Sequence, residues 1–309
     1  MQEEIEKLQE LLRDDPSNFQ ARRELSIILA DNGFNEEALS NLEYLLKYFS
    51  NDAELYYNIG ILYEKIKDFS KAEEAYNKAI SISPQEDFYY NLGEVLVSLE
   101  KWDDAIEAFK TVLKTDSKDG NCYFNLGLCF LNKNENNIAV DYFQKAVELN
   151  PKDIFAYFYL GNIYQNIGLT NFAEDCYRKV LDISPDYSWA YFNLASIAYK
   201  NENLEDARDY LEKTIQYNPN DIEAFKLLAK IYVKNNETVE FIEHLEEKLE
   251  DEENGDLYYV LAQLYRIVEN MNSYGYNLEK ALDNSLTLTY PKKAIVQELK
   301  YIEALNNDK

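Results

Sequence analysis

The sequence predicts an all-α solenoid, in which one short helical unit is copied many times along the chain. Three residue series share one period. Pro84, Pro151, Pro185 and Pro219 are separated by 67, 34 and 34 residues. Alanines recur at the same spacing, at Ala38, Ala72, Ala105, Ala139, Ala173 and Ala207. So do pairs of an apolar and a small residue, at Ile59-Gly60, Leu92-Gly93, Leu126-Gly127, Leu160-Gly161, Leu194-Ala195, Leu228-Ala229 and Leu261-Ala262. One period in three independent series is typical of a repeat protein.

Each unit is predicted to hold two antiparallel helices. In the fourth unit, residues 121–131 carry an apolar stripe at helical spacing, a polar break follows at 132–137, and a second stripe occupies 138–149. Pro151 then ends the unit, because proline cannot continue a helix. Gly127 and Ala139 fall where we expect the two helices to approach most closely.

Eight units are predicted, at 19–52, 53–86, 87–119, 120–153, 154–187, 188–221, 222–254 and 255–286. Residues 2–14 suggest a leading half-repeat within an end segment 1–18. Residues 291–306 suggest a capping helix within an end segment 287–309. We interpret 19–221 as six well-formed repeats and 222–286 as two degenerate ones.

The repeat pattern weakens toward the C-terminus. Phe241 and Tyr274 replace the small residue of the second helix, and Lys248 replaces a small apolar residue. The segment 246–253 is rich in acidic residues. It is either a hinge between the last two units or a solvated helix end. We therefore expect hydrogen exchange to show lower protection at 222–286 than at 120–221.

These residues resemble the tetratricopeptide repeat. The fifth unit carries the family's pattern of aromatic, Leu-Gly, Tyr, Ala, aromatic, small apolar residue and Pro, at Tyr157, Leu160-Gly161, Tyr164, Ala173, Tyr177, Val180 and Pro185. The resemblance covers nearly the whole chain. It implies a right-handed superhelix of antiparallel helix pairs, in which the first helices line a concave groove.

Charge and composition exclude several functions. The 309 residues contain 57 Asp and Glu against 31 Lys and Arg, a net charge of −26. Such a chain lacks the positive surface needed to bind nucleic acid or anionic membranes. The acidic N-terminus does not resemble a secretory signal, and the uncharged stretch 154–173 carries four amides and two glycines, unlike a membrane span. We expect a cytoplasmic protein.

The chain also lacks the residues of a chemical site. Cys122, Cys129 and Cys176 lie on or beside apolar stripes, and His244, the only histidine, has acidic neighbours. Acidic pairs such as Asp103-Asp104 open second helices, where negative charge stabilises the helix N-terminus. We predict no metal, no cofactor and no enzyme activity.

Two rows of residues are candidates for a binding surface. By the family register, the residue before the Leu-Gly pair points into the groove, and it is asparagine at Asn58, Asn91, Asn125 and Asn193. A carboxamide can both donate to and accept from a peptide backbone. One position earlier an aromatic row runs through Tyr57, Tyr90, Phe124, Phe158 and Phe192, joined by Phe155, Trp189 and Tyr199. The alternative is that these rings pack between repeats.

Charged residues could add specificity to that surface. The family's clamp for chaperone C-termini is not met: from the fifth unit its five positions hold Phe158, Asn162, Asn193, Glu223 and Leu227, which lack the required basic residues. Lys226, Lys230 and Lys234 instead form one stripe on a first helix, and we expect Arg266 to extend it. Such a stripe would orient an acidic segment or a C-terminal carboxylate.

The resulting hypothesis is a non-catalytic protein-interaction module, an adaptor or co-chaperone-like scaffold that binds a peptide or helical segment in its groove. A partner with apolar anchors and an acidic end would fit it. The alternatives are a scaffold that self-assembles through its ends and, less favoured, the accessory repeat array of a glycosyltransferase-type enzyme.

Overall fold

The computed structural model describes residues 2–307, and every regular element in that range is an α-helix. The prediction of an all-α fold is therefore confirmed. The described chain divides into two compact units, the first ending at Ile163 and the second beginning at Tyr164. Met1 and residues 308–309, at the outer limits of the predicted end segments, lie outside the described range.

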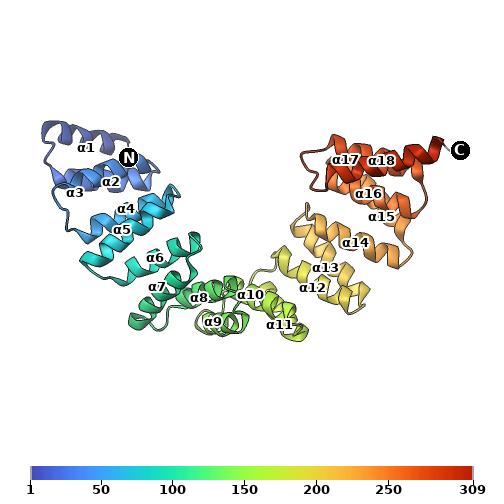
Figure 1. Cartoon of the computed structure of the whole chain (residues 1–309), viewed down its shortest axis with the longest axis horizontal. Coiled ribbons are helices and arrows are strands. Elements are labelled where there is room, and N and C mark those ends of the chain that lie inside the picture. Colours follow the sequence, from blue (N-terminus) through green and yellow to red (C-terminus); the bar gives the residue numbers. More distant parts are fainter. Residues whose placement is uncertain (1, 308–309) are drawn as a thin grey trace. The chain divides into compact units, whose positions relative to one another are not determined.

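The first unit contains helices α1 to α9 and most of α10. Their bounds are α1 (Gln2–Asp14), α2 (Phe19–Asp31), α3 (Asn35–Leu46), α4 (Ala53–Lys65), α5 (Phe69–Ile82), α6 (Glu86–Ser98), α7 (Trp102–Thr115), α8 (Gly120–Asn132), α9 (Asn136–Leu149) and α10 (Ile154–Asn166). Figure 1 shows them following one another as pairs.

The second unit continues the same succession and ends in an additional helix. Its helices are α11 (Thr170–Ile183), α12 (Ser188–Lys200), α13 (Leu204–Tyr217), α14 (Ile222–Lys234), α15 (Thr238–Asp251), α16 (Gly255–Ile267), α17 (Met271–Asp283) and α18 (Lys292–Asn307). Helix α18 packs on α17.

The turn inside each pair contains one residue in the left-handed conformation. These residues recur at the repeat period: Gly33, Lys67, Glu100, Asn134, Gly168, Glu202, Asn236 and Glu269, with φ between 57° and 81°. Only two of the eight are glycine, although glycine adopts this conformation most easily. The remaining turns therefore hold a side chain in a less favourable backbone region, which the packing of the two helices must stabilise.

In three helix pairs of the first unit, an aromatic ring of the second helix lies against a glycine of the first helix. Gly60, Gly93 and Gly127 of the first helices face Tyr76, Phe109 and Phe143, which stand sixteen residues later in the second helices. A Cβ atom on Gly127 would lie 2.7 Å from the Phe143 ring. The small residue is needed at the predicted close approach, and its partner is this ring.

In the second unit, the same two positions change together. Alanine replaces the glycine and leucine replaces the ring, in the pairs Ala195 and Leu211, Ala229 and Leu245, and Ala262 and Leu278. All six residues are buried in one hydrophobic cluster. A larger residue on the first helix is thus matched by a smaller one on the second, as close packing requires.

Phe241 and Tyr274, the large residues at the small position of the last two pairs, are buried. Phe241 stacks on Tyr232, with ring centroids 4.6 Å apart. Helices α15 and α17 form despite these replacements. The separation of 222–286 as two degenerate repeats stays an interpretation of the sequence.

The pairing of small and large residues predicts a specific rescue. Gly127→Ala should lower the free energy of unfolding by about 1–3 kcal/mol, because the new methyl group overlaps the Phe143 ring. Adding Phe143→Leu recreates the Ala195–Leu211 combination, so the two substitutions should couple favourably by about 1 kcal/mol or more. Urea unfolding of the single and double variants measures this coupling.

Gly120→Ala is the matched control, because the nearest atom to its Cβ would be at an ordinary 3.6 Å. We expect little change in stability for this variant. Strictly additive effects of the Gly127 and Phe143 substitutions would show that the pair does not set the helix spacing.

Candidate functional site

The candidate site is a groove of about 730 Å³ in the second unit. Its walls are the first helices of three successive pairs, α12, α14 and α16, and Tyr290 from the segment before α18. We call it the C-terminal groove. It is lined by Phe192, Ser196, Tyr199, Glu223, Lys226, Leu227, Ala229, Lys230, Val233, Lys234, Tyr259, Val260, Gln263, Leu264, Ile267 and Tyr290.

Equivalent positions of the repeat build this groove. Phe192, Lys226 and Tyr259 occupy the position of the predicted aromatic row, and Leu227 and Val260 occupy the position of the asparagine row. The repeat period therefore brings the same face of each first helix to one surface. Sequence reasoning missed Leu227, Val260 and Tyr259, although extending the two rows by 33 or 34 residues would have found them.

The three lysines of α14 all line the groove, but their environments differ. Lys226 Nζ pairs with Glu223 at 2.6 Å and lies 4.5 Å from the centre of the Tyr290 ring. Burial opposes its charged form, but Glu223 and Tyr290 outweigh burial and raise the pKa of Lys226. Lys234 Nζ is 3.4 Å from Glu202.

Lys230 lies between these two lysines and is exposed. Unlike its two neighbours, it forms no ion pair with any residue in the range 2–302. Leu227 is half-buried beside it, and Val260 and Leu264 are buried on the facing helix. The groove thus combines an unpaired cation with an apolar floor.

Arg266 does not extend the lysine stripe, so that expectation is wrong. Its guanidinium carbon lies 5.9 Å from the centre of the Tyr274 ring of α17. The neighbouring residue Ile267 lines the groove instead. The reason is helical geometry, because adjacent residues of a helix point in directions about 100° apart.

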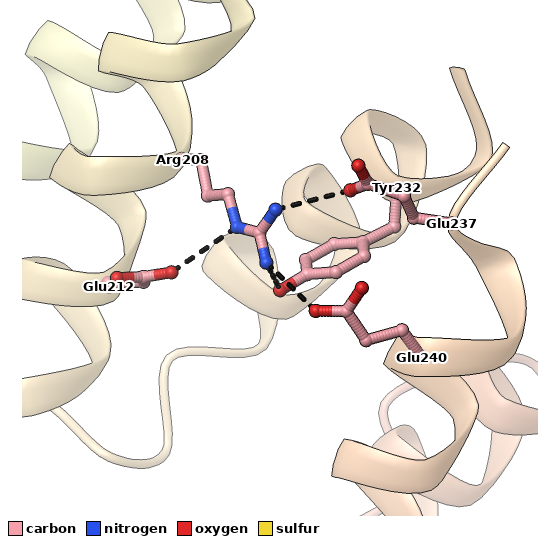
Figure 2. A network of polar contacts seen from close by, with 5 residues as sticks. All are labelled: Arg208, Glu212, Tyr232, Glu237 and Glu240. Carbon is pink, nitrogen blue, oxygen red and sulfur yellow. Dashed lines mark hydrogen bonds and ion pairs between the residues drawn. The ribbon is translucent and has the colours of Figure 1, made fainter. Parts of the chain in front are cut away.

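A cluster of polar side chains joins the sixth and seventh repeats. Figure 2 shows Arg208 of α13 reaching toward Tyr232 of α14 and two carboxylates at the start of α15. Its guanidinium pairs with Glu237 at 3.1 Å and with Glu240 at 3.2 Å, and donates a hydrogen bond to the Tyr232 hydroxyl. Arg208 also lies 4.2 Å above the Tyr232 ring and pairs with Glu212 of its own helix at 3.4 Å. This cluster fixes α13 against α14 and α15, and α14 carries the lysine stripe.

The asparagine row makes bonds between repeats in the first unit. The Asn91 amide donates to the Tyr57 hydroxyl at 3.1 Å, and the Asn125 amide donates to the Tyr90 hydroxyl at 3.3 Å. Each asparagine therefore contacts the aromatic residue of the preceding repeat. Asn58 is half-buried beside a smaller hollow of about 180 Å³ between α2 and α4.

The aromatic row of the first unit also packs between helices. Tyr57 stacks on Phe88 with ring centroids 4.6 Å apart, and the ring centroids of Phe124 and Tyr159 are 5.9 Å apart. Tyr159 replaces asparagine in the fifth repeat. Tyr159 in turn stacks on Phe143 at 5.4 Å. These contacts support the packing alternative for Tyr57, Tyr90 and Phe124, whose role in binding a peptide stays a prediction.

The other predicted residues are divided between the two units. Phe155 is exposed, and Phe158 and Asn162 are half-buried, all in the first unit. In the second unit, Trp189 is exposed and Asn193 is half-buried, and neither lines the groove. Phe192 and Tyr199 do line it. For the five residues outside the groove, peptide binding stays a prediction.

The cysteines have the environment of core residues. All three are free thiols; Cys122 and Cys129 are buried and Cys176 is half-buried. Burial raises the pKa of Cys129 to about 12 and that of Cys176 to about 11. Both thiols are protonated near neutral pH, which makes them poor nucleophiles and poor metal ligands. Among the side chains that the structure describes, no three or more His, Cys, Asp or Glu form a cluster that could hold a metal ion.

Each helix within the described range is too short or too polar to span a bilayer.

Comparison with protein families gives four matches, each described as tetratricopeptide repeat. They cover residues 53–86 and 120–153, 89–123, 142–171 and 170–231. Together these segments make up more than half of the chain.

Among curated proteins, the chain is 34% identical over 80 residues to ER membrane protein complex subunit 2-A of Xenopus laevis and to subunit 2 of Xenopus tropicalis. The match covers 26% of this chain and 27% of each relative, so only about a quarter of the relatives' length is spanned.

Several solved structures share the fold. MamA is 26% identical with a TM-score of 0.50, over 52% of this chain and 95% of MamA. YrrB, described as a TPR protein with an unusual peptide-binding site, is 27% identical with a TM-score of 0.51, over 61% of this chain and 97% of YrrB. PilF of Pseudomonas aeruginosa, at 17% identity, resembles it in fold alone, with a TM-score of 0.57 over 69% of this chain and 97% of PilF.

Removing Arg208 should loosen the contact between the sixth and seventh repeats. We expect Arg208→Ala to destabilise this region by about 1–2 kcal/mol, because a partly buried cation–π and ion-pair contact is lost. Hydrogen exchange should then quicken in α14 and α15 and stay unchanged in α4 to α9. Lys179→Ala is the control, because Lys179 is more exposed and pairs with Asp182 of its own helix. An equal effect of the two substitutions would contradict a special role for Arg208.

Proposed function

The chain belongs to the tetratricopeptide repeat family, and on this premise we propose that it is a protein-interaction scaffold whose C-terminal groove binds a peptide segment of a partner. Repeats of this family and similar structures such as YrrB and MamA support the interaction role. The finer role of adaptor or co-chaperone-like scaffold is part of the proposal.

One observation carries the choice of groove: an unpaired lysine of α14 lies beside an apolar floor formed by α14 and α16. A ligand carboxylate can approach Lys230 while a neighbouring apolar side chain covers Leu227, Val260 and Leu264. Burying the apolar side chain supplies affinity, and the charge sets the orientation of the ligand. The proposed ligand is therefore a peptide with an acidic residue next to an apolar anchor.

The size and charge of the groove suit such a ligand. About 730 Å³ lies within the usual range of roughly 300–1,000 Å³ for ligand sites, enough for a few side chains. In a chain of net charge −26, the groove is lined by three lysines and one glutamate, so its local charge is positive. A positive groove favours acidic segments over neutral or basic ones.

We further propose that the protein acts without catalysis and in the cytoplasm. The three free cysteines agree with a reducing compartment. The similarity to a subunit of a membrane protein complex agrees with a role in assembly, and it concerns only a quarter of that relative.

The proposal predicts that charge reversal at Lys230 weakens peptide binding at least tenfold. A peptide is selected from a phage-displayed library on the unmodified full-length protein and is labelled for fluorescence anisotropy. Its affinity should fall as salt concentration rises, and Lys230→Glu with Lys234→Glu should remove that dependence.

Lys213→Glu serves as the control, because Lys213 is exposed on α13 and lies outside the groove. We expect it to leave the affinity within twofold. A library that yields no peptide sensitive to Lys230, or a peptide equally weakened by the Lys213 substitution, would contradict the assignment.

A further inference from the structure

The last helix of the chain is bonded directly to groove residues. The Glu298 carboxylate of α18 accepts hydrogen bonds from the Tyr259 hydroxyl at 3.0 Å and from the Gln263 amide at 2.9 Å. Both donors belong to α16 and line the groove. A third hydrogen bond comes from the Tyr274 hydroxyl of α17. One carboxylate outside the repeats thus orients two side chains of the candidate site.

The segment before α18 supplies part of the groove wall. Tyr290 lines the groove. The centre of its ring lies 4.1 Å from the centre of the Tyr259 ring and 4.5 Å from the Lys226 ammonium nitrogen. The apolar wall and one of the lysines are therefore held in place by a residue that belongs to no repeat.

A buried carboxylate holds this segment on α16. Asp256 is 1% exposed, and its two oxygens accept hydrogen bonds from the Thr289 backbone N–H and hydroxyl, both at 2.8 Å. The Gly255 N–H also donates to the Thr287 hydroxyl at 2.7 Å. Tyr290 follows Thr289 directly, so Asp256 fixes the position from which Tyr290 enters the groove.

We propose that the segment from Asn284 to Ile302 is a working part of the C-terminal groove, and that peptide binding and docking of this segment stabilise each other. Glu298 is the positioning residue that couples them. The inference rests on the proposed function. Its physical basis is reciprocity: if the docked segment increases peptide affinity, bound peptide must increase the stability of docking by the same factor.

A purely structural cap would behave differently. Terminal helices of repeat proteins cover the apolar face of the last repeat, and this role requires only that α18 pack on α17. Covering the last repeat does not require hydrogen bonds to two groove residues. Peptide binding would leave the stability of such a cap unchanged. Hydrogen exchange of α18, measured with and without peptide, therefore distinguishes a structural cap from a working part of the groove.

The test combines hydrogen exchange with binding of the selected peptide to the full-length protein. In the unmodified chain, saturating peptide should slow exchange in α18. Glu298→Ala should weaken peptide binding about tenfold and speed exchange in α18. Glu298→Gln, which keeps one acceptor oxygen and the side-chain volume, should recover part of the affinity. Gln297→Ala is the control, because this neighbour on α18 is exposed, and it should change neither measurement.

Several outcomes would overturn the inference. Unchanged affinity of the Glu298→Ala variant, with faster exchange in α18, would make the helix a structural cap and leave the proposed function standing. If Glu298→Ala fails to fold, the unmodified chain still decides, because peptide that binds without slowing exchange in α18 contradicts the coupling. Binding that ignores Lys230→Glu would instead refute the proposed function itself.

Discussion

The arrangement of the helices depends on one contact repeated along the chain, between a small residue of each first helix and the side chain sixteen residues later. In three pairs of the first unit this contact joins glycine to an aromatic ring, and a Cβ atom on any of Gly60, Gly93 or Gly127 would lie within 2.7 Å of that ring. Interiors pack at crystal-like density, so neither partner can grow alone. The paired change to alanine and leucine in the second unit follows from the same constraint.

This contact occupies one face of each first helix. Because one face of each first helix is committed to its partner helix, the remaining face is left to neighbouring repeats or to a ligand. In α4, α6 and α8 that face is used for bonds between repeats, through Tyr57, Asn91, Tyr90 and Asn125. In α12, α14 and α16 the equivalent positions hold Phe192, Lys226, Leu227, Tyr259 and Val260, and a groove remains open.

Much of the fold could be predicted from the sequence, because the same residue pattern recurs in each repeat. The period gave the all-α fold, and the spacing of Lys226, Lys230 and Lys234 placed them on one face. The sequence register could not decide between groove and packing for the aromatic row, because that depends on the neighbouring repeat, as the contact of Phe124 with Tyr159 shows. The partition into six regular and two degenerate repeats stays an interpretation.

Contacts that join a repeat to another repeat or to the C-terminal segment could not be predicted. Glu298 and Tyr290 have no equivalents in other units, so no register assigns them a direction, and Asp256 has the sequence context of an ordinary acidic loop. The contacts of Arg208 could not be predicted either, because its partners Tyr232, Glu237 and Glu240 come from another repeat. These contacts become visible only when distant segments are brought together.

The central claim is that the C-terminal groove is the peptide site, and a crystal structure of the full-length protein with the selected peptide tests it most directly. We predict peptide density between α12, α14 and α16, with a carboxylate within about 4 Å of the Lys230 ammonium, the reach of an ion pair, and an apolar side chain on Leu227 and Val260. Peptide bound along the asparagine row of α4, α6 and α8, with the groove empty, would contradict the claim.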